Sequence, residues 1–280
     1  LVGSEMCIRD RHYMMKRIFL YLLFPFIGSA QIINLPATRA EKEVTDNVTT
    51  LTERTYDVYR GNLTQKRLAT ENTYVFNSAG NAVSLEQKYG NIRLYYQYTY
   101  ADNRLQQVIL TKETHHYVEV TIGTYKYDDN GRMLSYTSIP QQNNTATATP
   151  TQIYTFTKWD TNGNAIEGTL ITPHSEALVY QEFDKQNRRT LLKMLTKADP
   201  PIEVRVALRY DREGRVVERS IAEGNTPPQV LRYTYDKKGI PTGTNNQQFK
   251  HTFDKKGNWI TRTIFVNGTI VGYVEREITN

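Results

Sequence analysis

Hydrophobic and polar residues alternate with a period of two along most of this chain from about residue 54 onward. In EVRVALRYD, for example, Val204, Val206 and Leu208 fall on one face of an extended segment, while Arg205 and Arg209 fall on the other. Period-two alternation in segments rich in Val, Ile, Tyr and Thr is typical of half-buried β-strands. The pattern therefore predicts an all-β chain.

A short motif separates these strands: an aromatic residue, then Asp, two polar residues and Gly. YDDNGRML, WDTNGNAI, YDREGRVV and FDKKGNWI are its clearest copies. Eight copies, which we call boxes 1 to 8, begin at Phe76, Tyr100, Tyr127, Trp159, Phe183, Tyr210, Tyr235 and Phe253. A spacing of about 25 residues indicates a repeat architecture with one supersecondary unit per period.

The composition of the box predicts a β-hairpin turn. Asp suits the first position of a type I turn, because its side chain accepts backbone hydrogen bonds. Gly suits the left-handed position that closes a three-residue hairpin loop with a bulge. The predicted structural turn residues are Asp128, Gly131, Asp160, Gly163, Asp184, Asn187, Asp211, Gly214, Asp236, Gly239, Asp254 and Gly257. Box 2 departs from the pattern, with Arg104 in the glycine position.

The same turn predicts the strand register. The Asp of a box should face the residue after Gly, and the box aromatic should pair with the residue two positions after Gly. Tyr210 is then expected to pair with Val216, and Phe253 with Trp259, the latter as a buried aromatic contact. Such cross-strand pairs are the unit of sheet stabilisation.

These boxes resemble the tyrosine–aspartate (YD) repeats of the Rhs and teneurin families, over roughly residues 73–280. The resemblance implies consecutive antiparallel hairpins that form one long, twisted, curled sheet or a partial barrel or shell. The chain carries far fewer boxes than large family members, and boxes 1, 2 and 5 are degenerate. It is similar to small exported YD-repeat proteins of Bacteroidota, a resemblance that implies no defined activity.

The first 30 residues do not follow the strand pattern. LVGSEMCIRD resembles the translation of a sequencing adapter, so residues 1–13 are predicted to be a read-through artefact. MKRIFLYLLFPFIGSA then has a basic start, an apolar run and small residues, which is typical of a signal peptide cleaved after Ala30. An apolar run of about ten residues is shorter than the roughly 20 that a membrane helix needs. We therefore predict export to the periplasm, outer surface or medium, with no membrane span after signal removal.

Four segments follow from these patterns. They are residues 1–13, the artefact; 14–30, the signal peptide; 31–53, an N-terminal linker or cap; and 54–280, the YD-repeat β-domain. The one cysteine, Cys7, lies in the artefact, so the exported chain can form no disulfide. Polar stretches at 137–150, 197–203 and 223–229 are predicted loops.

Motifs for catalysis or metal binding are missing from the sequence. His115 and His116 are adjacent, so on a strand they would point to opposite faces and could not share a metal. PHSE at 173–176 places a histidine, serine and acid as neighbours, whereas a triad is assembled in space. The DDNG and DTNG fragments lack the glutamate that ends a calcium loop. We predict no enzyme, no catalytic residue, no cofactor and no metal.

The charge of the chain disfavours a nucleic-acid partner. Lys and Arg number 35 and Asp and Glu 29, and the two signs are interspersed along the sequence.

Three functions stay open. The first function is a binding scaffold for a cell-surface glycan or protein, with unknown binding residues and oligomeric state. The alternatives are a structural envelope or extracellular protein, and an accessory remnant of an Rhs-type toxin system. A coherent patch of exposed aromatic residues would favour binding, whereas uniformly polar faces would favour a structural role.

Overall fold

The computed structural model describes residues 36–45, 47–142, 145–146 and 149–280. The predicted adapter segment (1–13), the signal peptide (14–30) and its cleavage site at Ala30 lie outside the described residues. Residues 33–280 form one compact unit, which contains all the described residues.

The described chain is an antiparallel all-β structure, which confirms the predicted fold class at this level. Two short 3-10 helices, η1 (Tyr59–Gly61) and η2 (Leu63–Gln65), follow the first strand. The strands are β1 (Thr50–Val58), β2 (Lys66–Phe76), β3 (Ala82–Tyr89), β4 (Ile92–Ala101), β5 (Arg104–Glu113), β6 (Val118–Tyr127), β7 (Met133–Gln142), β8 (Thr145–Ala146), β9 (Gln152–Trp159), β10 (Ala165–Thr172), β11 (Ser175–Phe183), β12 (Arg189–Thr196), β13 (Glu203–Tyr210), β14 (Val216–Glu223), β15 (Gln229–Tyr235), β16 (Pro241–Thr244), β17 (Gln248–Phe253), β18 (Trp259–Val266) and β19 (Thr269–Thr279).

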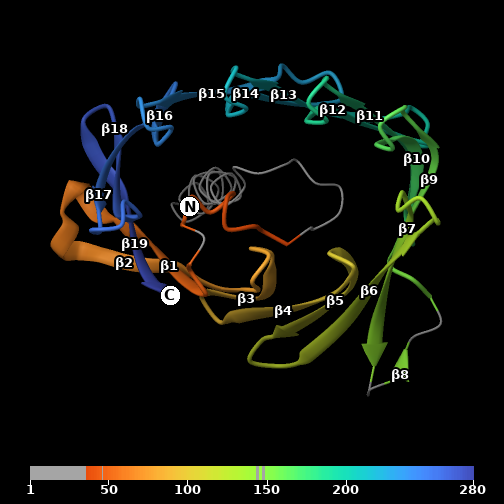
Figure 1. Cartoon of the computed structure of the whole chain (residues 1–280), viewed down its shortest axis with the longest axis horizontal. Coiled ribbons are helices and arrows are strands. Elements are labelled where there is room, and N and C mark those ends of the chain that lie inside the picture. The colour runs from red at the N-terminus through yellow and green to blue at the C-terminus, as the bar shows by residue number, and fades with distance from the viewer. Residues whose placement is uncertain (1–35, 46, 143–144, 147–148) are drawn as a thin grey trace, which may run out of the picture. The chain divides into compact units, whose positions relative to one another are not determined.

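Strand pairing closes the sheet into a barrel (Figure 1). Each strand from β1 to β7 and from β9 to β18 pairs with the next. β7 pairs with both the two-residue β8 and β9, and β1 pairs with both β2 and β19. Closure leaves no free sheet edge along this ring, and free edges are what make open sheets prone to aggregate. The sequence predicts a curled sheet or partial barrel; the full closure comes from β1, which joins the last strand to the second.

β1 begins at Thr50, inside the range that the sequence assigns to a linker or cap. The segment TLTERTYDV alternates well enough to form a strand: Leu51 is fully buried, whereas Thr52 and Arg54 lie on the opposite face. A second difference concerns the stretch 137–150, which the sequence predicts as a loop. Its first part belongs to β7, because Thr137 and Ile139 continue the outward-facing alternation and pair with β6.

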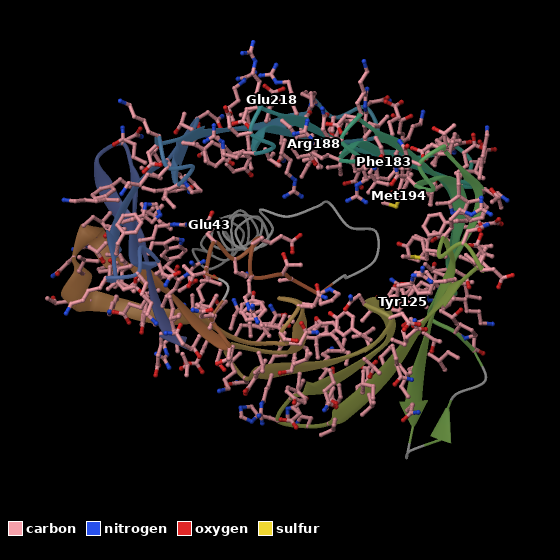
Figure 2. All side chains as sticks on the ribbon, in the orientation of Figure 1. Glu43, Tyr125, Phe183, Arg188, Met194 and Glu218 are labelled. Carbon is pink, nitrogen blue, oxygen red and sulfur yellow. The ribbon has the colours of Figure 1, made fainter. Side chains whose placement is uncertain are left out.

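The inner face of the barrel carries a band of aromatic side chains. Figure 2 places Tyr125 and Met194 on the inner side and Glu218 on the outer side. Registered pairs extend the inner set through the band Tyr74, Phe76, Tyr96, Tyr98, Tyr125, Tyr136, Tyr154 and Phe156. The Tyr125 and Tyr136 ring centroids lie 4.8 Å apart. Gly123 makes room for this contact, since a Cβ there would lie 2.6 Å from the Tyr136 ring.

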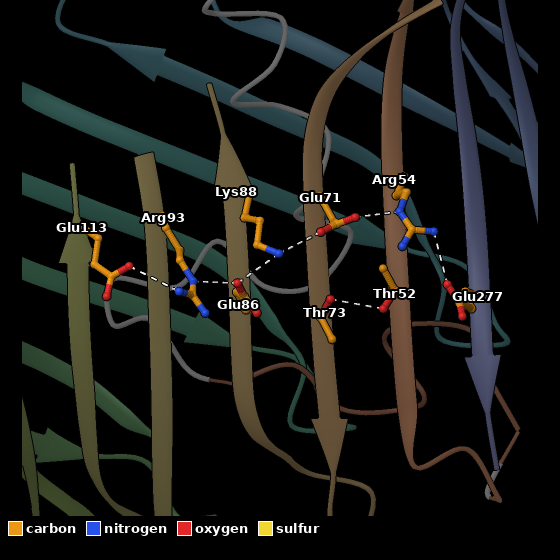
Figure 3. A network of polar contacts seen from close by, with 9 residues as sticks. All are labelled: Thr52, Arg54, Glu71, Thr73, Glu86, Lys88, Arg93, Glu113 and Glu277. Carbon is orange, nitrogen blue, oxygen red and sulfur yellow. Dashed lines mark hydrogen bonds and ion pairs between the residues drawn. The ribbon is translucent and has the colours of Figure 1, made fainter. Parts of the chain in front are cut away.

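The outer face carries a ladder of alternating charges across the seam where the two ends of the sheet meet (Figure 3). Its members are Glu113, Arg93, Glu86, Lys88, Glu71, Arg54 and Glu277, from β5 through β1 to β19. The nitrogen–oxygen distances run from 2.6 Å for Arg54–Glu71 to 3.4 Å for Arg93–Glu113. Each exposed ion pair contributes little alone, but the continuous ladder favours one register for all six strands.

Residues 36–45, 47 and 48, which we call the strap, lie against the inner face. Glu43 is on the inner side of the ring in Figure 2. The Arg39 amide donates to the Gly80 carbonyl, and the Thr45 amide donates to the Asn258 side chain at 3.0 Å. Gly80 belongs to box 1 and Asn258 follows the turn of box 8, so the strap connects the first and last boxes across the seam.

Candidate functional site

The two ends of the barrel differ in chemistry. Because antiparallel strands alternate in direction, the eight box turns collect at one end, which we call the box end. The remaining connections, β1–β2, β3–β4, β5–β6, β7–β9, β10–β11, β12–β13, β14–β15, β16–β17 and β18–β19, lie at the opposite end. We call this the apolar end, for the side chains described below.

The structure places the predicted turn residues at the box end, in one repeated geometry. In box 8 the Gly257 amide donates to the Asp254 carbonyl at 3.2 Å, and Asp254 Oδ1 accepts from the amides of Lys256 and Asn258. The residues in the glycine position have positive φ, from 60° to 86°, at Gly80, Gly131, Gly163, Asn187, Gly214, Gly239 and Gly257. The other predicted acids, Asp128, Asp160, Asp184, Asp211 and Asp236, accept in the same way.

The turn of box 2 has a different backbone conformation. Asp102 and Asn103 have φ of 51° and 59°, and Ala101 pairs directly with Arg104. Two consecutive left-handed residues form the short hairpin turn that matches strand twist. Arg104 is therefore the first residue of β5 rather than a misfit in the glycine position.

Asp and Arg side chains pair across several box turns. Asp211 and Arg215 are 2.6 Å apart, and Asp128–Arg132 and Asp184–Arg188 repeat the contact at the same distance. Partial burial would raise the pKa of Asp211, but hydrogen bonds from the Arg215 backbone and side chain outweigh it and lower that pKa. The carboxylates are thus held ionised by their own hairpins.

Several boxes also contact the preceding hairpin. The hydroxyl groups of Tyr100, Tyr127, Tyr210 and Tyr235 donate to the carbonyls of Ala82, Leu105, Arg189 and Val216, at 2.8 to 3.0 Å. Three arginines stack on the aromatic ring of the next box: Arg132 on Trp159, Arg188 on Tyr210 and Arg215 on Tyr235. Many of the polar groups of the boxes are therefore used within the turns and between neighbouring hairpins.

A cluster of charged side chains surrounds Trp259 beneath the strap. Trp259 Nε1 donates to Glu43 at 2.6 Å, and the Arg276 guanidinium lies 3.2 Å from the centroid of the indole ring. Arg276 bonds Glu53 at 3.0 Å, and Arg262 reaches Glu43 at 3.3 Å. Burial would raise the pKa of Glu53, but Arg276 and nearby cations lower it to about 2. Each buried cation of this cluster thus has a carboxylate beside it, which indicates a structural role for the cluster.

The apolar end carries most of the exposed large hydrophobic side chains. Among the described residues, nine of the ten such side chains lie at this end; Phe253, at the box end, is the exception. They are Tyr59, Leu63, Leu68, Tyr89, Tyr117, Val118, Ile171, Ile202 and Val271. Exposed apolar side chains gathered on one part of a surface can mark an interaction site. We take this rim as the candidate site.

Three tyrosines stand out within the rim. Tyr59, Tyr89 and Tyr117 are 59%, 40% and 51% exposed, and they lie at three successive connections: β1–β2, β3–β4 and β5–β6. Neighbouring connections at one end are two strands apart, or roughly 10 Å. The rim therefore presents a row of aromatic rings along one arc of the barrel.

Sequence reasoning did not identify this rim. Tyr89 and Tyr117 lie at or beside connections midway between boxes, in YGN and HHYV, and Tyr59 lies before box 1. An aromatic residue in or beside a turn has few neighbouring side chains to cover it. The position of these tyrosines near predicted turns could therefore have indicated their exposure. His115 and His116 are exposed in the same β5–β6 connection, and His174 in the β10–β11 turn.

Across the described ranges, no group of three or more His, Cys, Asp or Glu side chains is placed to hold a metal ion. Within the same part of the chain, no helix is long and apolar enough to cross a membrane.

Comparison with known proteins gives likenesses to solved structures only. No protein-family model matches the chain, and no curated protein matches it. One similar structure is a porin-like protein from Bacteroides uniformis ATCC 8492, with 15% identity, a TM-score of 0.41, and coverage of 84% of this chain and 98% of that chain. Another is a porin-like protein from Bacteroides vulgatus ATCC 8482, with 6% identity, a TM-score of 0.35, and coverage of 83% and 98%.

Proposed function

We propose that this chain is an exported, non-enzymatic β-barrel that binds a cell-surface partner, a glycan or a protein, through its apolar end. The observation that carries the proposal is the collection of exposed tyrosines and aliphatic side chains at one end of the barrel. Tyrosine offers a large, rigid contact surface with a polar hydroxyl, which suits it to interfaces.

The row formed by Tyr59, Tyr89 and Tyr117 favours an extended partner. A pyranose ring has an apolar C–H face that stacks on an aromatic ring, and a glycan chain could meet successive tyrosines along the rim. Nearby loops add polar groups for orientation, including the exposed His116 and Asn91. Binding residues on loops held by a rigid scaffold are a common arrangement.

We further propose that the outer face of the barrel contacts water rather than lipid. A transmembrane barrel needs an outward apolar band around its whole circumference, and an outward Arg or Lys near the bilayer centre costs about 2–4 kcal/mol. Here the charge ladder faces outward across β19 and β1–β5 (Figure 3). Outward isoleucines such as Ile122 and Ile139 occur farther round the sheet, so they cover only part of the circumference.

The YD-repeat relationship is part of the same proposal. Box hairpins whose tyrosine and arginine contact the neighbouring hairpin account for the repeated letters of the motif. A role as an accessory remnant of an Rhs-type toxin system is the third candidate, and a toxin or immunity gene beside this one would favour it.

A glycan array and a pull-down from envelope extracts, both with the chain starting at Gln31, test the binding proposal. We expect a defined glycan or protein to be retained, with loss of binding when Tyr59, Tyr89 and Tyr117 are all changed to Ser. Repeated absence of any ligand would favour the alternative, a structural envelope or extracellular protein in which the closed sheet itself is the function.

A further inference from the structure

Arginines on the inner face differ in how their charge is balanced. Arg262 and Arg276, beneath the strap, bond Glu43 and Glu53 respectively. Arg189 on β12 and Arg219 on β14 belong to no ion pair among the described residues. A cation removed from water is costly unless a counter-charge or hydrogen-bond acceptors compensate it.

Arg189 faces the inside of the barrel with two of its three guanidinium nitrogens unused. It pairs across the sheet with Phe183, and its Nη1 donates to the Gln181 side chain at 3.0 Å. Its Nε and Nη2 are buried and have no hydrogen-bond partner. Burial lowers the pKa of Arg189 to about 10, and among its surroundings only Tyr210 opposes this shift. The site thus has a positive charge and two nitrogens, Nε and Nη2, whose hydrogen bonds have no acceptor among the described residues.

Arg219 places a second cation on the same wall. It pairs with Leu208 on one side and Leu231 on the other, so it stands in an apolar part of the inner face. Its Nε is also buried without a partner. On β12, Leu191 pairs with Ala207, which puts Arg189 and Arg219 at nearly the same level on either side of β13. Their backbones are therefore about two strand spacings, roughly 10 Å, apart.

We propose that Arg189 and Arg219 form an anion-binding site on the inner wall of the barrel. Gln181, whose amide nitrogen donates to the Ala165 carbonyl at 3.0 Å, positions the Arg189 guanidinium. The ligand is an oxyanion group: a carboxylate, sulfate or phosphate. A guanidinium with free Nε and Nη2 presents the two parallel donors that such groups accept in bidentate fashion. Barrels of 16–18 strands are generally wide enough for water to reach the inner wall. This site is separate from the apolar end and does not depend on the function proposed there.

Isothermal titration with three probes tests the site: sodium sulfate, sodium phosphate and sodium glucuronate, at constant ionic strength adjusted with chloride. We expect saturable binding of at least one probe. Arg189→Gln should weaken it at least tenfold, and Arg219→Gln severalfold. Arg205→Gln, an exposed arginine on the outer face of β13, is the matched control and should bind like the wild type. Tighter binding of glucuronate indicates an acidic sugar as the source, and tighter binding of sulfate or phosphate an inorganic ion.

Sulfate stabilises proteins in general by exclusion from their surface, so a rise in melting temperature alone would not count. If Arg189→Gln does not fold, Arg219→Gln and Arg189→Lys take its place; the latter keeps the charge and loses the bidentate donors. Equal binding by the wild type and all of these variants would overturn the proposal. So would the absence of saturable binding for all three probes.

Discussion

Gly257 shows what a box turn requires of a single residue. Its φ is +86°, a conformation that L side chains rarely adopt, and a Cβ there would meet nothing within 4 Å. Only the backbone conformation therefore opposes a side chain at this position. Asn187 occupies the equivalent position of box 5 with φ of 60°, so asparagine is tolerated in the turn.

Replacing Gly257 with Val should destabilise the fold by about 1–2 kcal/mol, since a β-branched residue is strained in the left-handed region. Gly257→Asn should cost much less. Urea denaturation of both variants measures the difference, with Lys256→Val in the same turn as the control. Equal losses for the Asn and Val variants would contradict the left-handed turn.

The pair Phe253–Trp259 has the predicted register but not the predicted burial. The two residues are opposite each other, yet Phe253 is 45% exposed while Trp259 is 1% exposed. The strap explains the asymmetry, because Glu43 and the arginines 262 and 276 cover Trp259. No pattern in the sequence predicts that the strap returns to this part of the sheet.

Trp259→Ala should therefore cost about 3–5 kcal/mol, the range for a buried aromatic residue. Phe253→Ala should cost clearly less, about 1 kcal/mol, because much of its ring remains in water. Chemical denaturation of the two variants compares them directly. A larger loss for Phe253→Ala would mean that the strap does not cover Trp259.

His251 should make stability depend on pH. Burial and the charges of Arg262 and Arg276 lower its pKa to about 4, and its Nε2 accepts a hydrogen bond from Arg262 at 2.7 Å. In the unfolded chain histidine titrates near pH 6.5. The unfolded state therefore takes up the proton first as the pH falls, and stability should decrease from about pH 6.5 to about pH 4.

Unfolding free energies measured across this range check the effect. His251→Gln should flatten the dependence between pH 6.5 and 4. It should leave a further loss below about pH 4, where Glu53, with a pKa of about 2 in the folded state, begins to take up protons in the unfolded chain. A wild-type protein equally stable at pH 7 and pH 4.5 would contradict the environment described for His251.

At the scale of the element, the hairpin was predictable because its information is local. Asp and Gly define the turn, and the turn defines which residues pair, as Tyr210 with Val216. Box 2, which departs from the pattern at Arg104, has a different turn, because Asp102 and Asn103 both adopt the left-handed conformation. Contacts between hairpins, such as Arg215 on Tyr235, depend on the curvature of the sheet and could not be predicted from one repeat.

The tyrosine hydroxyl groups are expected to hold successive hairpins together. Tyr210→Phe removes the 3.0 Å bond to the Arg189 carbonyl and keeps the ring. The expected loss is about 0.5–1.5 kcal/mol, more if the carbonyl is left without a partner. Tyr180→Phe, on the outer face of β11, is the control for thermal or urea unfolding and should change stability by much less. Equal losses of stability in the two variants would contradict a stabilising role of the Tyr210 hydroxyl between hairpins.

At the scale of the whole molecule, closure and the difference between the two ends could not be predicted from the boxes. Closure depends on β1, which precedes the first box and pairs with the last strand, Tyr56 opposite Tyr273. The ends differ because every box turn falls on one side of an antiparallel ring, which leaves the intervening connections, with Tyr59 and Tyr117, on the other. The repeat motif alone predicts neither the closure of the barrel nor the difference between its ends.

Binding by the apolar end is the central claim, and a comparison of two triple variants on isolated cell-surface glycans and proteins tests it most directly. The first variant replaces the rim residues Tyr59, Tyr89 and Tyr117 with Ser. The second variant replaces three tyrosines of the outer face, away from the loops, with Ser: Tyr95, Tyr180 and Tyr273. Both variants are first shown to fold by their circular dichroism and unfolding curves. We expect the first variant to lose binding at least tenfold and the second to retain it. Retained binding in the first variant, or equal loss in both, would contradict binding by the apolar end.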